Sequence, residues 1–100
     1  MNDFEQLIRD IETEAQAEGP AAVAELAAFD TRFALASELM QLRKQMNVTQ
    51  KQLAAASGID QADISRIERG ELNPTVLTVA RLLLPLGRRL SIVPAERHAA

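Results

Sequence analysis

The sequence lacks cysteine, tryptophan and tyrosine, and it contains only one histidine, His98. Without cysteine no disulfide forms, and a lone histidine cannot assemble a zinc site, which needs about four ligands. No Gly-rich phosphate loop is present, and no motif places a nucleophile beside a base. We therefore expect no metal, no other cofactor, no small-molecule ligand and no enzymatic activity.

Long apolar runs are also missing. No segment approaches the roughly 18 consecutive apolar residues of a membrane span, and the first residues do not join a basic stretch to an apolar one. We expect a cytoplasmic protein without a membrane partner. The aromatic residues are three phenylalanines, whereas Ala, Leu, Gln, Arg and Glu are abundant. This composition favours helices over sheets, so the predicted fold class is all-α.

The net charge of −3 is distributed unevenly along the 100 residues. Residues 1–32 carry eight acidic and two basic side chains, which give −6, and residues 33–100 carry six acidic and nine basic ones, which give +3. This asymmetry indicates a basic module for nucleic acid behind an acidic segment with a different task. The expected parts are an acidic helical segment at 1–32, a second domain at 33–94 and a tail at 95–100.

Apolar residues recur at helical spacing through the first half of the chain, and capping residues mark the helix ends. Asn2 begins a candidate capping box, and Gly19-Pro20 ends the first helix because proline suits the first turn of the next one. Asp30-Thr31 is expected to cap or interrupt the second helix. The predicted helices span about 3–17, 20–29 and 32–46.

Two short helices are predicted next. Thr49 with Gln52 forms a second capping box, and Gly58 turns the chain. Asp60 is the expected cap of the following helix, which Gly70 stops. These helices span about 50–56 and 61–69, and their expected core residues are Leu53, Ile59, Ile64 and Ile67.

The last predicted helix is capped by either Asn73 or Thr75 and ends near Leu84, because Pro85 cannot continue it. Alternating apolar and polar residues then predict a short strand over 88–93. The apolar residues assigned to the last helix are Val76, Val79, Ala80, Leu82 and Leu83.

Two short helices joined by about three residues, with the small Ala54 and Ala55 ahead of the turn, meet the steric needs of a helix-turn-helix. The second helix then lies in the DNA major groove and the first lies across the backbone. The run from Thr49 to Gly70, TQKQLAAASGIDQADISRIERG, resembles the phage-repressor-like, or Xre, class. With the flanking helices, the resemblance covers about residues 36–93.

The helical N-terminus, the chain length and the run GRRLSIV are similar to the HigA-type antitoxins of toxin–antitoxin operons. This resemblance implies a five-helix phage-repressor-like domain with an N-terminal helical extension and a short C-terminal β-strand. It also implies a homodimer that binds double-stranded operator DNA, represses its own transcription and neutralises a RelE-like ribonuclease toxin. We expect dimerisation through the last helix or the strand at 88–93. The alternatives are a stand-alone Xre-type regulator without a toxin, and a helix-turn-helix adaptor that binds no DNA.

The family pattern assigns roles to individual side chains. Gln50 is expected to bind phosphate, Gln61 to pair with adenine, and Arg66 to reach a guanine or a phosphate. Asp63 departs from the pattern, and it either accepts a hydrogen bond from a cytosine or reinforces the helix N-terminus, which we favour. The predicted DNA contacts are Thr49, Gln50, Gln61, Ala62, Ser65, Arg66, Arg69 and Asn73.

Two groups of residues have other predicted roles. Arg43 is expected to pair with Glu68 inside the protein, as in similar repressors, and not to bind phosphate. The apolar row of the first helix needs a covering surface, and its acidic rim suits a basic protein, which the resemblance implies is the RelE-like toxin. A solvated decoration and a dimerisation element are the alternatives. The row consists of Phe4, Leu7, Ile8 and Ile11.

Overall fold

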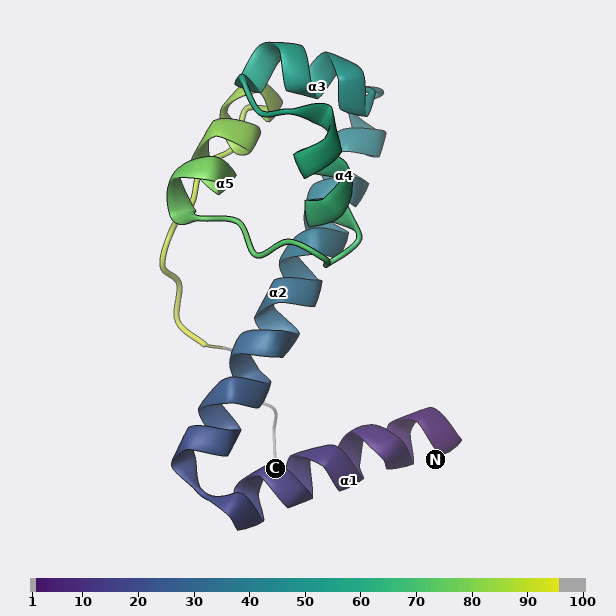
Figure 1. The fold of residues 1–100 in the computed structure, drawn as a ribbon, viewed down its shortest axis with the longest axis vertical. Helices are drawn as coiled ribbons and strands as arrows, with labels where there is room; N and C mark the ends of the chain where they lie inside the picture. Colours follow the sequence, from purple (N-terminus) through teal and green to yellow (C-terminus); the bar gives the residue numbers. More distant parts are fainter. Residues whose placement is uncertain (1, 96–100) are drawn as a thin grey trace.

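A long central helix organises the molecule: one end packs against a single helix, and the other end is surrounded by the remaining short helices (Figure 1). The computed structural model describes residues 2–95, and the predicted tail, His98 included, lies outside these residues from position 96 onward. The elements are α1 (Asp3–Glu18), α2 (Pro20–Gln45), α3 (Gln50–Ser57), α4 (Gln61–Glu68), α5 (Val76–Leu83) and the 3₁₀ helix η1 (Leu84–Leu86).

Helix α1 and the first half of α2 form a hairpin, which we call the acidic arm (residues 3–32). The Asn2 side chain accepts a hydrogen bond of 2.7 Å from the Glu5 amide, so the predicted cap is present. Gly19 has a φ of +112°, a conformation that glycine adopts readily, and Pro20 follows as the first residue of α2. The turn between the two helices is therefore where the sequence predicts it.

Helix α2 is continuous over 26 residues, so the predicted interruption at Asp30-Thr31 is wrong. The Thr31 hydroxyl donates to the Ala27 carbonyl at 2.9 Å, four residues back, and does not cap a new helix. The ranges predicted as two helices form one, which passes from the acidic arm into the second domain. No helix within residues 2–95, α2 included, combines the length and apolar character needed to cross a membrane.

Helices α3, α4 and α5 pack around the C-terminal half of α2, and we call this unit the helix-turn-helix module (residues 33–87). Thr49 and Gln52 form the predicted capping box with bonds in both directions, at 2.9 and 3.0 Å. Three of the four expected core residues, Leu53, Ile64 and Ile67, are buried, and the fourth, Ile59, is partly buried. The buried apolar cluster comprises Leu39, Leu53, Ile64, Ile67, Val79, Leu82, Leu83 and Leu86.

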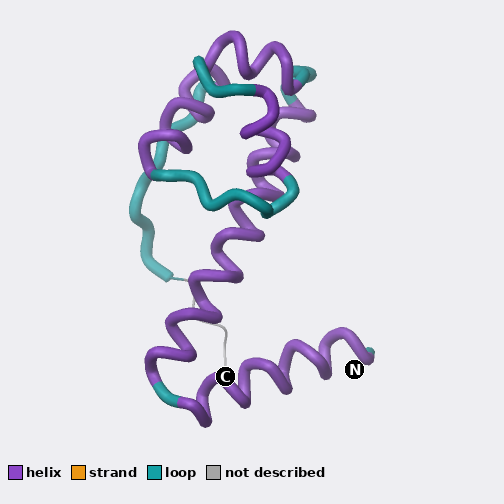
Figure 2. The backbone as a smooth tube through the Cα atoms, viewed as in Figure 1, coloured by secondary structure: helices purple, strands orange, loops and turns teal. Residues whose placement is uncertain are grey.

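The C-terminal part differs from the sequence prediction in several details. Thr75, one of the two predicted caps, caps α5 and accepts from the Thr78 amide at 3.1 Å. Of the apolar residues assigned to this helix, Val76 and Ala80 are exposed. Asp60 occupies the N-cap position of α4 without a side-chain capping bond. No strand forms within residues 2–95, and 88–93 run as a loop beyond η1 (Figure 2). A strand needs a partner for its ladder, and no neighbouring segment supplies one here. The fold class is all-α, as predicted.

Candidate nucleic-acid interface

The turn between α3 and α4 sets the angle of the candidate recognition helix, α4. Gly58 adopts a left-handed conformation with φ +75° and donates its amide to the Ala54 carbonyl at 3.0 Å. The next amide, that of Ile59, donates to the Ser57 hydroxyl at 3.2 Å. Ile64 and Ile67 bury one face of α4 against the core, at 1% and 2% exposure. The opposite face of α4 is thereby turned outward.

The outward face of α4 carries most of the predicted DNA contacts. Gln61 and Ala62 are exposed in its first turn, and Arg66 is exposed about one turn further along. Ser65 is half-buried and accepts a hydrogen bond from Arg69. One short helix therefore presents an amide, a methyl group and a guanidinium to solvent in sequence.

A buried ion pair fixes α4 to the long helix. Arg43 on α2 donates two hydrogen bonds to Glu68, the last residue of α4: Nε to Oε2 at 2.7 Å and Nη2 to Oε1 at 2.8 Å. The third guanidinium nitrogen, Nη1, donates to the Val48 carbonyl at 2.9 Å. This is the internal pair that the resemblance implies for Arg43. Two parallel hydrogen bonds between the planar guanidinium of Arg43 and the planar carboxylate of Glu68 restrict the orientation of the two groups as well as their distance. Helix α4 is therefore held rigidly.

Gln50 joins this network from the first turn of α3. Its amide nitrogen donates to Glu68 Oε1 at 3.0 Å, a contact that the sequence did not indicate. Burial raises the pKa of Glu68, but the hydrogen bonds from Arg43 and Gln50 and the charge of Arg43 outweigh it and lower the pKa overall. The pKa of Arg43 is raised, first by its hydrogen bond to Glu68. Both partners are thus charged at neutral pH, and they join α2, α3 and α4.

The two arginines of α4 and its C-cap are each matched with a carboxylate. Arg66 Nη1 lies 3.8 Å from Asp63 Oδ1, and Arg69 Nη2 lies 3.1 Å from Glu71 Oε2. The hydrogen bond between Arg69 and Glu71 lowers the pKa of Glu71 and raises the pKa of Arg69. The i,i+3 spacing of the first pair is visible in the sequence, although the sequence prediction did not use it. Glu71 lies beyond the helix, and only the fold brings it there.

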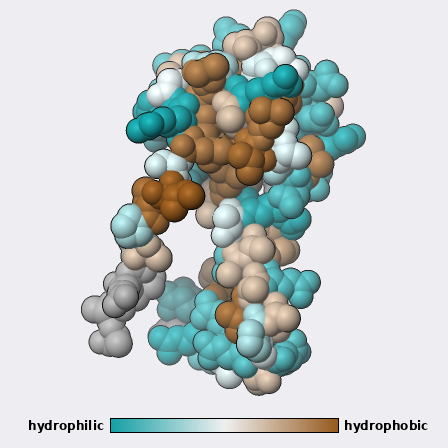
Figure 3. Space-filling view, turned by 90° about the vertical axis from the view of Figure 1, so that its left-hand side faces the viewer, coloured by the Kyte–Doolittle hydropathy of each residue, from teal (hydrophilic) through white to brown (hydrophobic). Residues whose placement is uncertain are grey.

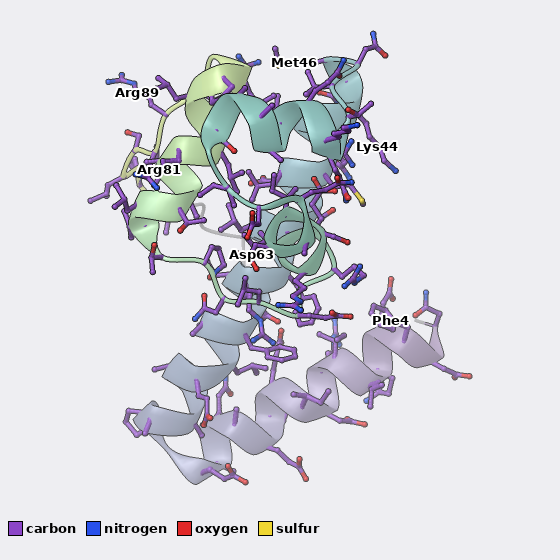
Figure 4. All side chains as sticks on the ribbon, turned by 45° about the horizontal axis from the view of Figure 1, so that its top comes forward. Phe4, Lys44, Met46, Asp63, Arg81 and Arg89 are labelled. Carbon is purple, nitrogen blue, oxygen red and sulfur yellow. The ribbon has the colours of Figure 1, made fainter. Side chains whose placement is uncertain are left out.

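The remaining predicted contacts lie at the edge of this surface. Thr49 is exposed but serves as the α3 cap, and Asn73 is exposed in the loop before α5. Figure 4 shows Lys44, at the end of α2, on the side of the module away from Arg81 and Arg89, which lie beside α5 and the C-terminal segment. Positive charge is therefore spread over two sides of the module.

The apolar row predicted on α1 is largely uncovered. Phe4 and Leu7 are 69% and 54% exposed, and Ile8 and Ile11 are each 39% exposed. Phe4 lies near the free end of α1, away from the helix-turn-helix module (Figure 4). A groove of about 290 Å³ runs between α1 and α2, with Ile11 and Phe29 among its apolar walls and Glu14, Glu18 and Glu25 among its acidic ones. The sequence predicted the row, but the groove requires the α1–α2 packing.

Comparisons with known proteins agree with this geometry. A curated relative from Haemophilus influenzae, named an uncharacterized HTH-type transcriptional regulator, is 51% identical over 63 residues, which are 63% of this chain and 64% of that protein. This chain thus spans less than two thirds of that relative. The HTH-type transcriptional regulator y4dJ of Sinorhizobium fredii is 40% identical over 58 residues, 58% of this chain and 75% of that protein.

A solved structure is also similar. It is described as a toxin-antitoxin module from Streptococcus pneumoniae, and it matches with a TM-score of 0.59 and 38% sequence identity over 73% of this chain and 80% of that chain. The helix-turn-helix family matches residues 39–93, more than half of the chain. This range contains α3, α4 and α5 together with the Arg43–Glu68 pair. The chain therefore belongs to the Xre-like helix-turn-helix family.

Proposed function

We propose that this chain is a dimeric, sequence-specific DNA-binding repressor of its own operon, whose acidic arm binds and neutralises a basic ribonuclease toxin of the RelE-like class. One observation carries the DNA-binding part: Gln61, Ala62 and Arg66 are exposed along a short helix that a buried ion pair holds in place. In helix-turn-helix proteins, such a helix enters the major groove with its N-terminal residues facing base edges.

Each exposed group has a chemical match in the groove. The Gln61 amide pairs with the N6 and N7 edge of adenine, a contact worth about 1–3 kcal/mol of discrimination. Ala62 meets a thymine methyl, and Arg66 meets guanine O6 and N7. The Gln50 amide uses one N–H for Glu68 and keeps its second N–H for a phosphate. Asn73 and Ser65 complete the contacts at the backbone, and Arg69 lies at the end of α4, paired with Glu71.

Dimerisation is supported by an apolar surface around α5. In Figure 3 the hydrophobic residues gather over this side of the module and continue onto the C-terminal segment. Apolar patches of this kind on small proteins mark interaction sites, and two half-sites bound together raise DNA affinity far above one. A groove of about 360 Å³ lies beside it, between α2 and the segment after η1. The exposed apolar residues are Val76, Leu77, Leu84, Leu90, Ile92 and Val93.

The toxin-binding part rests on the acidic arm. Residues 3–32 carry a net charge of −6, and the groove between α1 and α2 combines apolar walls with three glutamates. A basic helix that places one apolar side chain in the groove and its cationic residues on the rim fits both features. The similarity to a protein from a toxin-antitoxin module supports this class of partner.

The DNA-binding part is tested by titrating the purified protein with the DNA directly upstream of its own gene, from about 50 to 200 mM salt. We expect tight, salt-dependent binding by the wild type and its loss in the double variant Gln61→Ala, Arg66→Ala. Arg81→Ala is the matched control, because it removes the same charge from α5. A folded wild type that binds no DNA at low salt contradicts the repressor and supports the adaptor.

The toxin-binding part is tested by co-expression with the product of each gene that directly neighbours this one, where the proposal requires one of them to encode a small basic protein. We expect that protein to co-purify with this chain, and we expect Phe29→Glu to abolish the complex, because it adds a charge inside the groove. Met46→Glu is the matched control, since it places the same charge on an exposed residue at the other end of α2. If the wild type forms no such complex but represses its operator, the stand-alone regulator is favoured.

A further inference from the structure

The segment that forms the recognition surface has a net negative charge, although its helix is expected to approach phosphates. Between Asp60 and Glu71 the chain carries four acidic and two basic residues, a net charge of −2. One of the acids, Glu68, is buried and satisfied by Arg43. The other exposed charges include two arginine–carboxylate pairs, Arg66 with Asp63 and Arg69 with Glu71.

These pairs are held by the fold around them. The Glu71 amide donates to the Arg66 carbonyl at 2.9 Å, which returns the chain over the end of α4. The charge of Arg66 contributes to the lowered pKa of Glu71, so this carboxylate acts on both arginines. Ser65 accepts a further bond from Arg69 and directs its guanidinium. The four charged side chains form one cluster, which we call the arginine–carboxylate quartet (Asp63, Arg66, Arg69, Glu71).

We infer that Asp63 and Glu71 are specificity-determining residues, which suppress binding to DNA of unrelated sequence by occupying the two arginines that would otherwise bind phosphates. This inference rests on the proposed DNA-binding function and assigns a role to Asp63. It includes the cytosine contact that the sequence suggested as one role of Asp63, and it adds a second effect, because Asp63 also acts through Arg66.

The physical basis is a difference in hydrogen-bonding groups. A phosphate has acceptors only, whereas the base edges of the major groove have both acceptors and donors. A phosphate that takes Arg66 from Asp63 only exchanges one anion for another, and it leaves the carboxylate close to the negative backbone. A guanine–cytosine pair satisfies both side chains, because guanine O6 and N7 accept from an arginine while cytosine N4 donates to a carboxylate. Sequence-independent affinity depends on the number of phosphates neutralised, so the quartet lowers it. The matching base edges retain their contacts.

The test compares two duplexes of equal length, the DNA directly upstream of the gene and a scrambled version of it, over about 50–200 mM salt. For Asp63→Asn and for Glu71→Gln, we expect the scrambled duplex to bind about tenfold more tightly, with a salt slope steeper by about one phosphate contact. Binding of the upstream duplex should tighten less, so the ratio between the two affinities falls.

Two control variants separate this effect from overall charge. Asp60→Asn removes the same charge from the start of α4, where the side chain makes no capping bond, and it should leave the affinity ratio unchanged. Asp63→Glu keeps the carboxylate and should retain the ratio of the wild type. Matching thermal midpoints verify that each variant is folded, as expected for side chains that are about half exposed.

The outcomes distinguish this inference from the proposed function. If Asp63→Asn and Glu71→Gln tighten both duplexes by the same factor, or only as much as Asp60→Asn does, the carboxylates contribute charge alone and the inference is overturned. If neither duplex binds the wild type at low salt, the proposed function itself fails. A lower affinity ratio in both variants, with Asp60→Asn unchanged, supports the inference.

Discussion

At the scale of single residues, Glu68 is the side chain on which three helices depend. It closes α4, accepts two bonds from Arg43 on α2 and one from Gln50 on α3, and is 9% exposed. Replacing one member of a buried ion pair leaves the other charge unpaired, which costs about 3–5 kcal/mol. The orientation of the candidate recognition helix is thus linked to the protonation of one carboxylate.

This link predicts a specific pH dependence of stability. The pKa of Glu68 is lower in the folded chain than its ordinary value of 4.5, so its stabilising contribution is complete above that value and disappears as the pH falls toward the folded pKa. We expect the free energy of unfolding of the wild type to decrease below about pH 4.5 more steeply than that of a variant without this carboxylate. Urea denaturation followed by circular dichroism at several pH values measures this difference.

The comparison variant is the double substitution Arg43→Met, Glu68→Met. It removes both charges together and fills a similar volume, a change that is often neutral or stabilising for buried pairs. Glu68→Gln alone should be strongly destabilised at pH 7, because Arg43 stays buried without a counter-charge. Equal pH slopes in the wild type and the double variant would show that other carboxylates dominate acid unfolding.

At the same scale, Gly70 packs closely against α2, next to the start of the module. It has a φ of +73°, and a Cβ placed on it would lie 2.6 Å from Cε1 of Phe33 on α2. Gly58 has nearly the same φ but open space around its Cβ position. We expect Gly58→Ala to cost about 1–2 kcal/mol for the backbone alone, and Gly70→Ala to cost more.

Thermal denaturation of the two glycine variants measures the difference. Adding Phe33→Leu to Gly70→Ala should recover the part due to the clash, because the smaller side chain vacates the ring position. If Gly70→Ala is no worse than Gly58→Ala, the Phe33 ring moves aside freely and does not restrain the start of the loop after α4.

At the scale of elements, the caps explain why most helix boundaries were predictable. The Thr49 hydroxyl accepts a hydrogen bond from the Gln52 backbone amide, and the Thr49 backbone amide donates to the Gln52 side-chain oxygen. We expect Thr49→Ala to destabilise the fold by about 1 kcal/mol, because α3 loses its N-cap bond. Thr31→Ala is the matched control within α2, and its effect should stay within about 0.5 kcal/mol, since alanine favours the helix interior.

Denaturation midpoints of these two threonine variants provide the measurement. A large loss in Thr31→Ala would mean that its bond to Ala27 contributes to the continuity of α2, contrary to the expectation. A small loss in Thr49→Ala would mean that packing of Leu53, and not the cap, determines where α3 begins.

Sequence patterns predicted the order of the helices, except for the break within α2, because periodicity and caps are local. The pattern at Asp30-Thr31 failed because a threonine hydroxyl also bonds to a carbonyl four residues back, and the sequence does not tell which bond forms. The exposure of Val76 and the contact from Gln50 to Glu68 depend on the packing of distant segments. The ion pair of Arg43 was accessible only through family resemblance, since its members are 25 residues apart.

At the scale of the whole molecule, the chain exposes two unlike surfaces. The acidic arm carries a net charge of −6, and the module exposes an apolar surface around α5. Leu77 and Leu84 are 65% and 78% exposed and lie seven residues apart, a spacing that returns to nearly the same side of a helix. This surface is where we expect a second copy to bind.

The oligomeric state tests this expectation. Sedimentation equilibrium should give a dimer for the wild type and a monomer for Leu77→Glu with Leu84→Glu, because each introduced charge would be buried without a partner. The matched control is Leu7→Glu on α1, which should leave the dimer intact. A wild type that stays monomeric at the concentrations used for DNA binding would contradict the proposed dimer, as would dissociation by the control.

The unbroken helix α2 also determines the angular relation between the two ends of the molecule. Each residue of an α-helix advances by about 100° around the axis, so one residue inserted near Ala34 would swing the arm by about 100° relative to α4. Seven inserted residues, close to two turns, would restore the direction to within about 20°. The number of residues in α2 thus sets the direction in which a protein bound to the arm would point relative to α4. The position of that protein around the DNA would change with this number.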